Sequence, residues 1–250
     1  MVDGIQVDEA GFDEGQPAIL VQTATAAYAY HKEGAGFSSL LDVDGRDWIG
    51  YAPDNGPAGE YRGIPNMVFR GSEEGAFHPG HRGAQTELLV ADRDRVSLQS
   101  ISRNGRWQVQ WDISERCARM TVLRVDAADP RHWLLYEGTP GGQFAAQTSR
   151  CLRSSGASGT LNEAREEDLP ASAWVAFTDP ECRRSLFLHC QKQGGCTDMY
   201  KPMPPMTVFG FGRRLQGVDA GIEAAGTVLT IGFTETTNVL EIGAYVAEVL

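Results

Sequence analysis

The fold is decided by residues 86–125, which contain the runs Thr86-Glu-Leu-Leu-Val-Ala, Arg95-Val-Ser-Leu-Gln-Ser-Ile-Ser, Arg106-Trp-Gln-Val-Gln-Trp-Asp-Ile and Ala118-Arg-Met-Thr-Val-Leu-Arg-Val. Apolar and polar side chains alternate in these runs, so that Trp107, Val109 and Trp111 fall on one face of a strand. Between the second and third runs, Asn104-Gly105 is a strong signal for a two-residue hairpin turn. The stretch therefore predicts an antiparallel meander with one buried face.

Similar short runs lie on both sides of this meander. They begin at Ala18, Ala26, Phe37, His132, Trp174, Ser185, Met206 and Val228, and an Asp44-Gly45 turn follows the third of them. Ten or more short strands with tight turns predict an all-β fold, a two-sheet antiparallel β-sandwich with at most one or two short helices. The stretch 161–169, which ends at Pro170, is expected to be a helix. The tail 239–250 is expected to be helix rather than strand.

No linker, internal repeat or low-complexity segment divides the chain. Its 250 residues, of which 42% are hydrophobic, are enough for one large β domain with a sizeable core. We therefore expect residues 18–250 to form a single β-sandwich domain and residues 1–17 to be a loose N-terminal segment.

The chain is acidic, with a formal net charge of −11 and a pI of about 4.9. This charge argues against nucleic acid as a partner, because binding phosphates requires a basic face. No stretch approaches the ~20 apolar residues of a membrane span, so no membrane partner is expected either. Residues 1–17 lack the basic and apolar regions of a signal peptide, which leaves a cytoplasmic location or a secreted protein whose signal has been removed. The oligomeric state is unknown from the sequence.

The cysteines are five in number and irregularly spaced, at Cys117, Cys151, Cys182, Cys190 and Cys196. An odd number with this spacing is not a disulfide framework, although the last two could pair across a turn. No metal site and no cofactor are predicted: the many Asp and Glu residues would suit Ca²⁺, but no calcium loop is visible. The absence of GxSxG, P-loop, Rossmann and HExxH motifs argues against serine hydrolases of the α/β type, nucleotide enzymes and zincins.

Two loop segments combine residue types that serve sugar chemistry. Tyr61-Arg-Gly-Ile-Pro-Asn places Tyr61 beside Arg62, and a hydroxyl with a guanidinium can bind a carboxylate or a pair of sugar hydroxyls. Phe77-His-Pro-Gly-His-Arg places His78 and His81, two candidate acid/base groups, next to Arg82. A structural turn and two solvated loop histidines would account for the same patterns.

Further candidates lie on or beside strands. Glu137 stands where the run His132-Trp-Leu-Leu-Tyr-Glu meets a Gly/Pro-rich turn, so it is a candidate catalytic carboxylate, although a side chain facing water fits equally well. Tyr200 is a second catalytic candidate, while His189 and Arg213 are candidates for substrate binding. Trp111 represents five tryptophans that could stack on sugar rings, most of which are expected in the core.

Three segments carry a family resemblance. They are Gly36-Phe-Ser-Ser-Leu-Leu-Asp-Val-Asp-Gly-Arg-Asp-Trp, the Tyr-Arg-Gly-Ile-Pro-Asn of 61–66 and the Tyr-Glu-Gly-Thr-Pro-Gly-Gly of 136–142. The first resembles the opening hairpin of galactose-mutarotase-like super-sandwich proteins, and the whole chain is similar to polysaccharide-lyase-like bacterial β-sandwich proteins. The resemblance implies a super-sandwich with a concave glycan-binding face, and it matches no catalytic motif residue by residue.

The leading hypothesis from the sequence is a carbohydrate-active enzyme, a polysaccharide lyase that cleaves a uronate-containing glycan by β-elimination. Arg62 would neutralise the carboxylate, His78 or His81 would take the C5 proton, and Tyr61 or Tyr200 would protonate the leaving oxygen. One alternative is a glycoside hydrolase or sugar epimerase that uses Glu137 with a second carboxylate or a His. Another is a non-catalytic glycan-binding sandwich. Each predicts an oligo- or polysaccharide partner.

Overall fold

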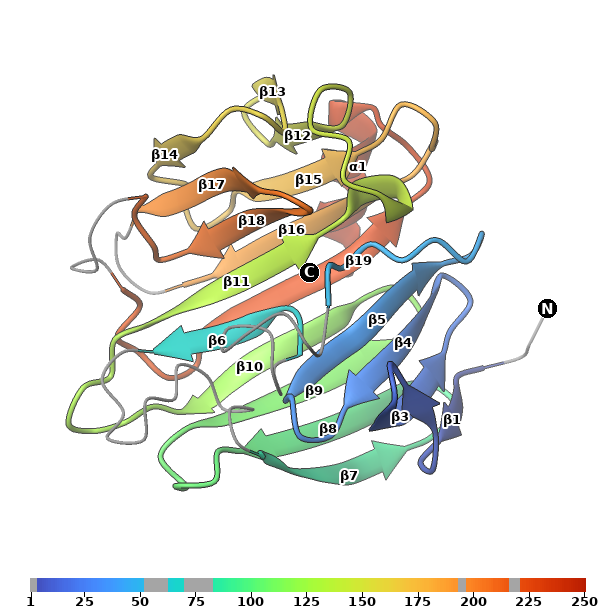
Figure 1. The fold of residues 1–250 in the computed structure, drawn as a ribbon, viewed down its shortest axis with the longest axis vertical. Helices are drawn as coiled ribbons and strands as arrows, with labels where there is room; N and C mark the ends of the chain where they lie inside the picture. The colour runs from blue at the N-terminus through green and yellow to red at the C-terminus, as the bar shows by residue number, and fades with distance from the viewer. Residues whose placement is uncertain (1–3, 52–62, 70–82, 193–196, 216–220) are drawn as a thin grey trace.

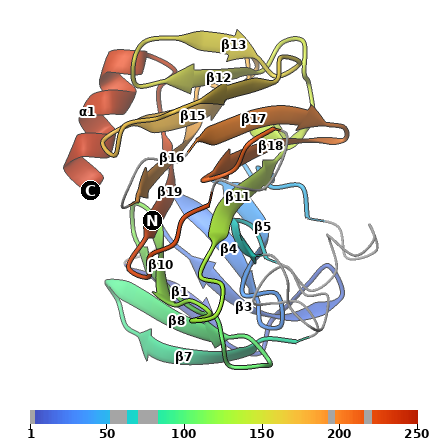
Figure 2. The same cartoon turned by 90° about the vertical axis from the view of Figure 1, so that its left-hand side faces the viewer.

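The structure is a computed structural model that describes residues 4–51, 63–69, 83–192, 197–215 and 221–250. The chain forms two layers of antiparallel strands (Figures 1 and 2). The back layer is one nine-stranded sheet, and the front layer consists of two five-stranded sheets. The predicted all-β sandwich is confirmed.

The back sheet contains the predicted meander as its strands β7 to β10. In spatial order the sheet is β13 (Ser158–Thr160), β12 (Arg150–Arg153), β15 (Trp174–Thr178), β16 (Ser185–Gln191), β19 (Val228–Thr234), β10 (Ala118–Arg124), β9 (Gln108–Ser114), β8 (Arg95–Ile101) and β7 (Gln85–Ala91). Leu98 lies opposite Trp111, as an aligned apolar face requires. Gly105, with a φ of +71°, makes the turn between β8 and β9, where glycine has no steric penalty.

The front layer consists of two sheets, each built from neighbouring antiparallel strands. The first front sheet contains β1 (Gln6–Asp8), β2 (Phe12–Asp13), β3 (Gln16–Gln22), β4 (Ala26–His31) and β5 (Gly36–Asp42). The second front sheet is, in spatial order, β14 (Arg165–Glu167), β17 (Asp198–Met203), β18 (Met206–Phe211), β11 (His132–Gly138) and β6 (Asn66–Phe69).

Isolated bridges join the two front sheets. One connects Phe37 to Ile64 and the other connects Ile49 to Gly138. Next to the first bridge, Gly36 and Gly63 approach so closely that a Cβ on either would collide with the backbone of the other. The two glycines therefore let the sheets meet, and the sheets together form one outward face.

Side chains from both layers meet in a core that runs from Ile5 to Phe233 in the sequence. Phe37 of β5 and Trp111 of β9 illustrate the contact between layers, with ring centroids 4.5 Å apart. The other face of the back sheet is covered in part by helix α1 (Val239–Val249), which confirms the helix predicted for the tail. Asn238 caps α1 by accepting a hydrogen bond from the Leu240 amide at 2.9 Å. No helix in the described part of the chain is long and apolar enough to cross a membrane.

Two local expectations differ from the structure. The helix predicted for 161–169 is wrong, because residues 165–167 form strand β14 and pair with β17, with Arg165 opposite Tyr200. Sheet pairing here outweighs the helix preference of a Glu- and Arg-rich segment. Within the segment expected to be loose, β1 and β2 both pair with β3. A short 3₁₀ turn, η1 (Pro140–Gly142), follows β11.

A buried ion pair ties the first front sheet to the back sheet. Arg184, just before β16, contacts Asp42 of β5 at 2.8 Å and Glu235 at 2.6 Å. Asp42 is buried and also accepts a hydrogen bond from Trp48 Nε1 at 2.9 Å. Burial opposes its charged form, but the hydrogen bonds from Trp48 and Arg46 and the Arg184 charge outweigh that effect and lower the pKa of Asp42.

Replacing Arg184 with methionine should destabilise the fold strongly, because Asp42 would remain as an uncompensated buried carboxylate. We expect a loss of about 3 kcal/mol or more, seen as a fall in Tm of about 6–12 °C for a chain of this length. The neighbouring Arg183 is exposed, so Arg183→Met is the matched control and should leave Tm nearly unchanged. Thermal melting followed by circular dichroism measures both, and equal shifts in the two variants would contradict the role given to the pair.

Candidate functional site

The outward face of the second front sheet brings a carboxylate and an ammonium group onto one row. Glu137 of β11 and Lys201 of β17 both lie opposite Val208 of β18, one on each side. Side chains alternate along a strand, so the preceding residues, Tyr136 and Tyr200, point into the core. The row of Glu137, Val208 and Lys201 therefore points away from the main core, and Glu137 and Val208 are themselves buried there.

Glu137 is a buried carboxylate that the chain fixes on both sides. Its side chain is 4% exposed and accepts a hydrogen bond from Asn66 Nδ2 at 3.4 Å, and its carbonyl accepts one from the Gly50 amide at 3.0 Å. The next residue has to be glycine, because a Cβ on Gly138 would collide with the Tyr136 ring. The Tyr-Glu-Gly sequence thus sets where this carboxylate lies.

Around this row the face is apolar, with cations beside it. A cluster separate from the main core contains Val68, Trp133, Leu135, Met199 and Val208. The guanidinium of Arg213 lies over the Trp133 ring, 5.7 Å from its centroid. Burial and the nearby Arg213 charge lower the pKa of Lys201, which makes its ammonium a better proton donor than an exposed lysine.

The adjoining end of the first front sheet contributes a buried histidine. His31, the last residue of β4, is fully buried, and its ring centroid is 5.6 Å from that of Tyr51. Neither ring nitrogen has a hydrogen-bond partner among the described residues. Burial lowers the pKa of His31, so the imidazole is neutral at physiological pH.

Of the residues predicted from the sequence, the structure brings Glu137 and Arg213 to this face. Five others, Tyr61, Arg62, His78, His81 and Arg82, lie outside the described residues. The remaining three, Tyr200, His189 and Trp111, lie elsewhere in the fold.

Tyr200 points away from the outward face. It is 1% exposed, and its hydroxyl donates to the Leu161 carbonyl at 2.5 Å. Burial raises its pKa well above the ordinary value for tyrosine. A buried phenol that already donates to the backbone is poorly placed to protonate a leaving oxygen, so the structure does not support the acid role predicted for it.

His189 belongs to the opposite side of the molecule. It lies on β16 of the back sheet, in a groove that also contains Arg119, and its Nε2 is 3.1 Å from the Ala171 carbonyl oxygen. Burial lowers the pKa of His189, against the hydrogen bond with the Ala171 carbonyl and with a smaller contribution from the Arg119 charge. The substrate-binding role predicted for His189 therefore stays a prediction, and His189 does not share a face with Glu137.

Stacking of sugar rings on tryptophan is not supported. Trp111 is completely buried between the layers, so neither face of its indole ring is free. The other four tryptophans are at most 7% exposed. Their size makes them packing residues here, as for most tryptophans.

Sequence reasoning missed Asn66 and Lys201 on this face, and His31 on the adjoining first front sheet. A signal existed for two of them: Asn66 ends the Tyr-Arg-Gly-Ile-Pro-Asn segment, and Lys201 directly follows Tyr200. The register that aligns Lys201 with Glu137 through Val208 has no counterpart in the sequence pattern. Among the described residues, no group of three or more His, Cys, Asp or Glu side chains could hold a metal ion.

The fold is similar to that of several solved structures, among them a galactose mutarotase-like protein. A galactose mutarotase-like protein from Lactobacillus casei superimposes with a TM-score of 0.54 at 10% identity, over 87% of this chain and 100% of that one. YidC from Thermotoga maritima gives 0.50 at 11%, over 96% of this chain, which spans 54% of the YidC chain. A galactose mutarotase related enzyme from Lactobacillus acidophilus gives 0.48 at 9%, over 88% and 98%.

These identities show a shared fold and nothing finer. No protein-family model matches the chain, and no curated protein sequence matches it. The resemblance to galactose-mutarotase-like proteins that the sequence suggested is confirmed at the level of the fold.

A carboxyl group beside this face should make stability depend on pH. Asp47 accepts hydrogen bonds from the Leu40 amide at 3.0 Å and the Ile49 amide at 3.1 Å. Burial raises its pKa to about 6, against those hydrogen bonds and with a smaller contribution from Asp13. Because the folded state holds this proton more tightly than the unfolded chain, its contribution to stability falls as pH rises from about 4 to about 6.

Asp47→Asn removes the charge, and the amide oxygen can still accept both hydrogen bonds. Between pH 4 and pH 6, we expect the Tm of the variant to fall less than the Tm of the parent protein. At pH 7.5 the variant should be at least as stable as the parent. Asp94→Asn, at an exposed position, is the control. Melting curves across this range test the prediction, which a lower Tm for Asp47→Asn at pH 7.5 would contradict.

Proposed function

We propose that the outward face of the second front sheet binds a sugar and that Glu137 acts there as an acid/base group that interconverts the sugar's anomers. One observation carries the proposal: Glu137, a buried carboxylate held by Asn66, shares a row with Lys201 across an apolar floor. Apolar surface with a few converging polar groups is typical of ligand sites.

Opening a pyranose ring requires two proton transfers. A base takes the proton from the anomeric hydroxyl while the bond from the anomeric carbon to the ring oxygen breaks, and an acid gives a proton to that ring oxygen. The open-chain aldehyde then rotates and closes by the reverse steps, so no oxidant or other reactant is consumed. Glu137 is suited to the first transfer and Lys201 to the second.

The spacing of these two groups fits a sugar ring. They lie on strands that flank β18, so their Cα atoms are about 10 Å apart, twice the usual distance between strands. In the proposed complex one pyranose lies between these two side chains, on the side of β18 that carries Val208. The likeness to a galactose mutarotase-like protein supports this proposal as an analogy of fold, while the side chains of the face supply the chemical reason.

Glu137→Gln should abolish anomer interconversion while leaving sugar binding nearly intact. The amide keeps the shape of the side chain and can accept from Asn66, but it is not a base. We expect kcat to fall by about 100-fold or more. Polarimetry of freshly dissolved α-glucose and α-galactose measures the rate, and Glu87→Gln on the exposed strand β7 is the matched control.

Lys201→Met should also lower kcat and should leave Tm nearly unchanged. Anomerisation by the parent protein at the uncatalysed rate, or by Glu137→Gln at the parental rate, would overturn the proposal.

The lyase and hydrolase hypotheses remain predictions with separate readouts. A lyase produces an unsaturated uronate that absorbs in the near ultraviolet, and its predicted residues Arg62, His78 and His81 lie outside the described part of the chain. A hydrolase releases reducing ends without that absorbance and needs a second carboxylate roughly 5–9.5 Å from Glu137. Retention on a glycan column without turnover would indicate a non-catalytic binding protein.

A further inference from the structure

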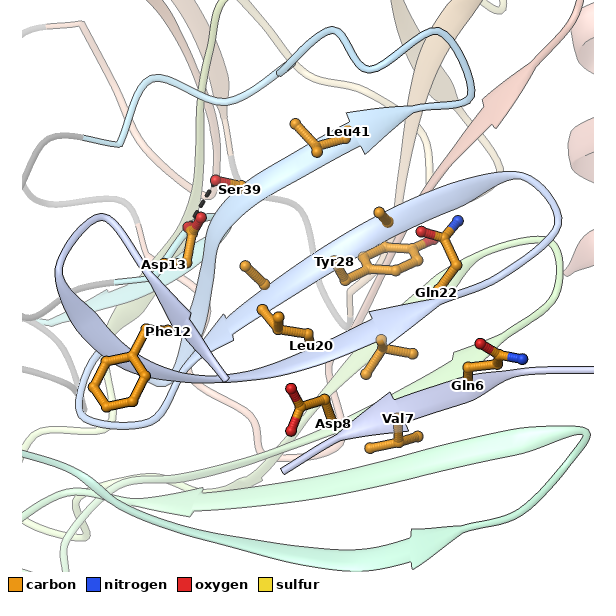
Figure 3. A pocket seen from close by; sticks show the side chains of 13 residues that line it. Gln6, Val7, Asp8, Phe12, Asp13, Leu20, Gln22, Tyr28, Ser39 and Leu41 are labelled. Atoms are coloured by element: carbon orange, nitrogen blue, oxygen red, sulfur yellow. Dashed lines mark hydrogen bonds between the residues drawn. The ribbon is translucent and has the colours of Figure 1, made fainter. Parts of the chain in front are cut away.

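The outward face of the first front sheet contains a groove of about 400 Å³ (Figure 3). Its floor consists of apolar side chains from three strands, namely Leu20, Ala27, Ala29 and Leu41. Polar side chains and the ring of Phe12 surround it, namely Gln6, Asp8, Phe12, Asp13, Gln22 and Ser39, and the buried Tyr28 also contributes to its lining. The two alanines on β4 leave the space that larger residues would fill.

A tight hairpin places Phe12 and Asp13 at the groove. Glu14 and Gly15, between β2 and β3, both have positive φ, at 49° and 75°, as a two-residue hairpin turn requires. Asp13 Oδ2 accepts hydrogen bonds from Ser38 Oγ at 2.6 Å and Ser39 Oγ at 2.7 Å. A bulge in β5 leaves Ser38 without an opposite residue on β4, and this brings both serines to Asp13.

Phe12 lies at the edge of the groove, as Figure 3 shows, and is 70% exposed. Among the described residues it is the one aromatic side chain in the set of exposed large hydrophobic residues. Exposed aromatic surface was the sequence signal that suggested sugar stacking. The tryptophans do not provide it, and Phe12 does.

The charges around the groove define its occupant. Asp8 and Asp13 line it, and no Lys, Arg or His does. An anionic ligand such as a uronate or a sugar phosphate would therefore be repelled. Asp13 Oδ1 has no hydrogen-bond partner among the described residues and is available to a hydroxyl donor.

We propose that this groove is a second saccharide site that holds one neutral hexose residue, with Phe12 stacked on the ring and Asp13 Oδ1 accepting from a ring hydroxyl. An exposed ring beside an apolar floor suits the C–H face of a sugar, and the groove has the volume for one or two sugar rings. The inference rests on the proposed saccharide function and extends it from a monosaccharide at Glu137 to an oligosaccharide that uses both front sheets.

Saturation-transfer NMR and calorimetric titration of the full chain test this proposal with lactose, maltotriose, cellotriose, trigalacturonate and tetramethylammonium as probes. We expect at least one neutral sugar to bind and Phe12→Ala to weaken it by about tenfold. Asp13→Asn, which can still accept from both serines, should weaken it less. Val43→Ala is the matched control, because Val43 is 54% exposed and does not line the groove.

Each outcome supports or overturns the proposal. Failure of every neutral sugar to bind, binding that Phe12→Ala leaves unchanged, or a preference for trigalacturonate or tetramethylammonium would overturn it. Glu137→Gln separates this proposal from the proposed function. If sugar binding depends on Phe12 but the protein has no anomerase activity, the groove proposal holds and the proposed function fails. If anomerase activity depends on Glu137 but no binding depends on Phe12, the proposed function holds and the groove proposal fails.

Discussion

The buried pair of Arg184 and Asp42 is the constraint from which the geometry of the front face follows. Asp42 accepts from the Trp48 indole, and the Trp48 carbonyl accepts from the Tyr136 hydroxyl at 2.6 Å. Tyr136 directly precedes Glu137 on β11. A charge pair between the layers is thus linked, through one indole and one phenol, to the candidate catalytic carboxylate. Such a pair adds little net stability over an apolar substitute, but it fixes which groups meet.

The alternation of side chains along these strands decides which residues lie at the candidate site. Because Tyr136 and Tyr200 are committed to the core, Glu137 and Lys201 must face outward, and their shared neighbour Val208 sets their separation. A second buried pair, Lys192 with Asp198 at 2.5 Å, ties the end of β16 to the start of β17 in the same way. Buried pairs between the layers therefore fix both β11, which contains Glu137, and β17, which contains Lys201.

The sequence predicts the fold class and the meander because period-two alternation and Asn-Gly or Asp-Gly turns are local signals. It misassigns 161–169, where the decision belongs to pairing between β14 and a strand more than thirty residues away. For the site, it identifies Glu137 by its place before a glycine-rich turn. The roles that it gives to Tyr200 and Trp111 are not supported, because both side chains are buried in the core. One residue of register decides whether a side chain faces the core or the solvent. Lys201 becomes a candidate only when that register is known.

The character of the front face also bears on the kind of sugar that we propose as the ligand. The fold is shared with proteins as different as YidC and a galactose mutarotase-like protein, so the layers alone select no chemistry. A polyuronate chain would meet a molecule of net charge −11 and, on the first front sheet, a groove lined by two carboxylates and no cation. At the second front sheet, Lys201 and Arg213 are local cations beside an apolar floor, which suits transfer of a proton within a neutral ring as well as binding. Under the two proposals, a neutral sugar would bind at both front sheets, whereas the carboxylates of the groove on the first front sheet would repel a polyanion.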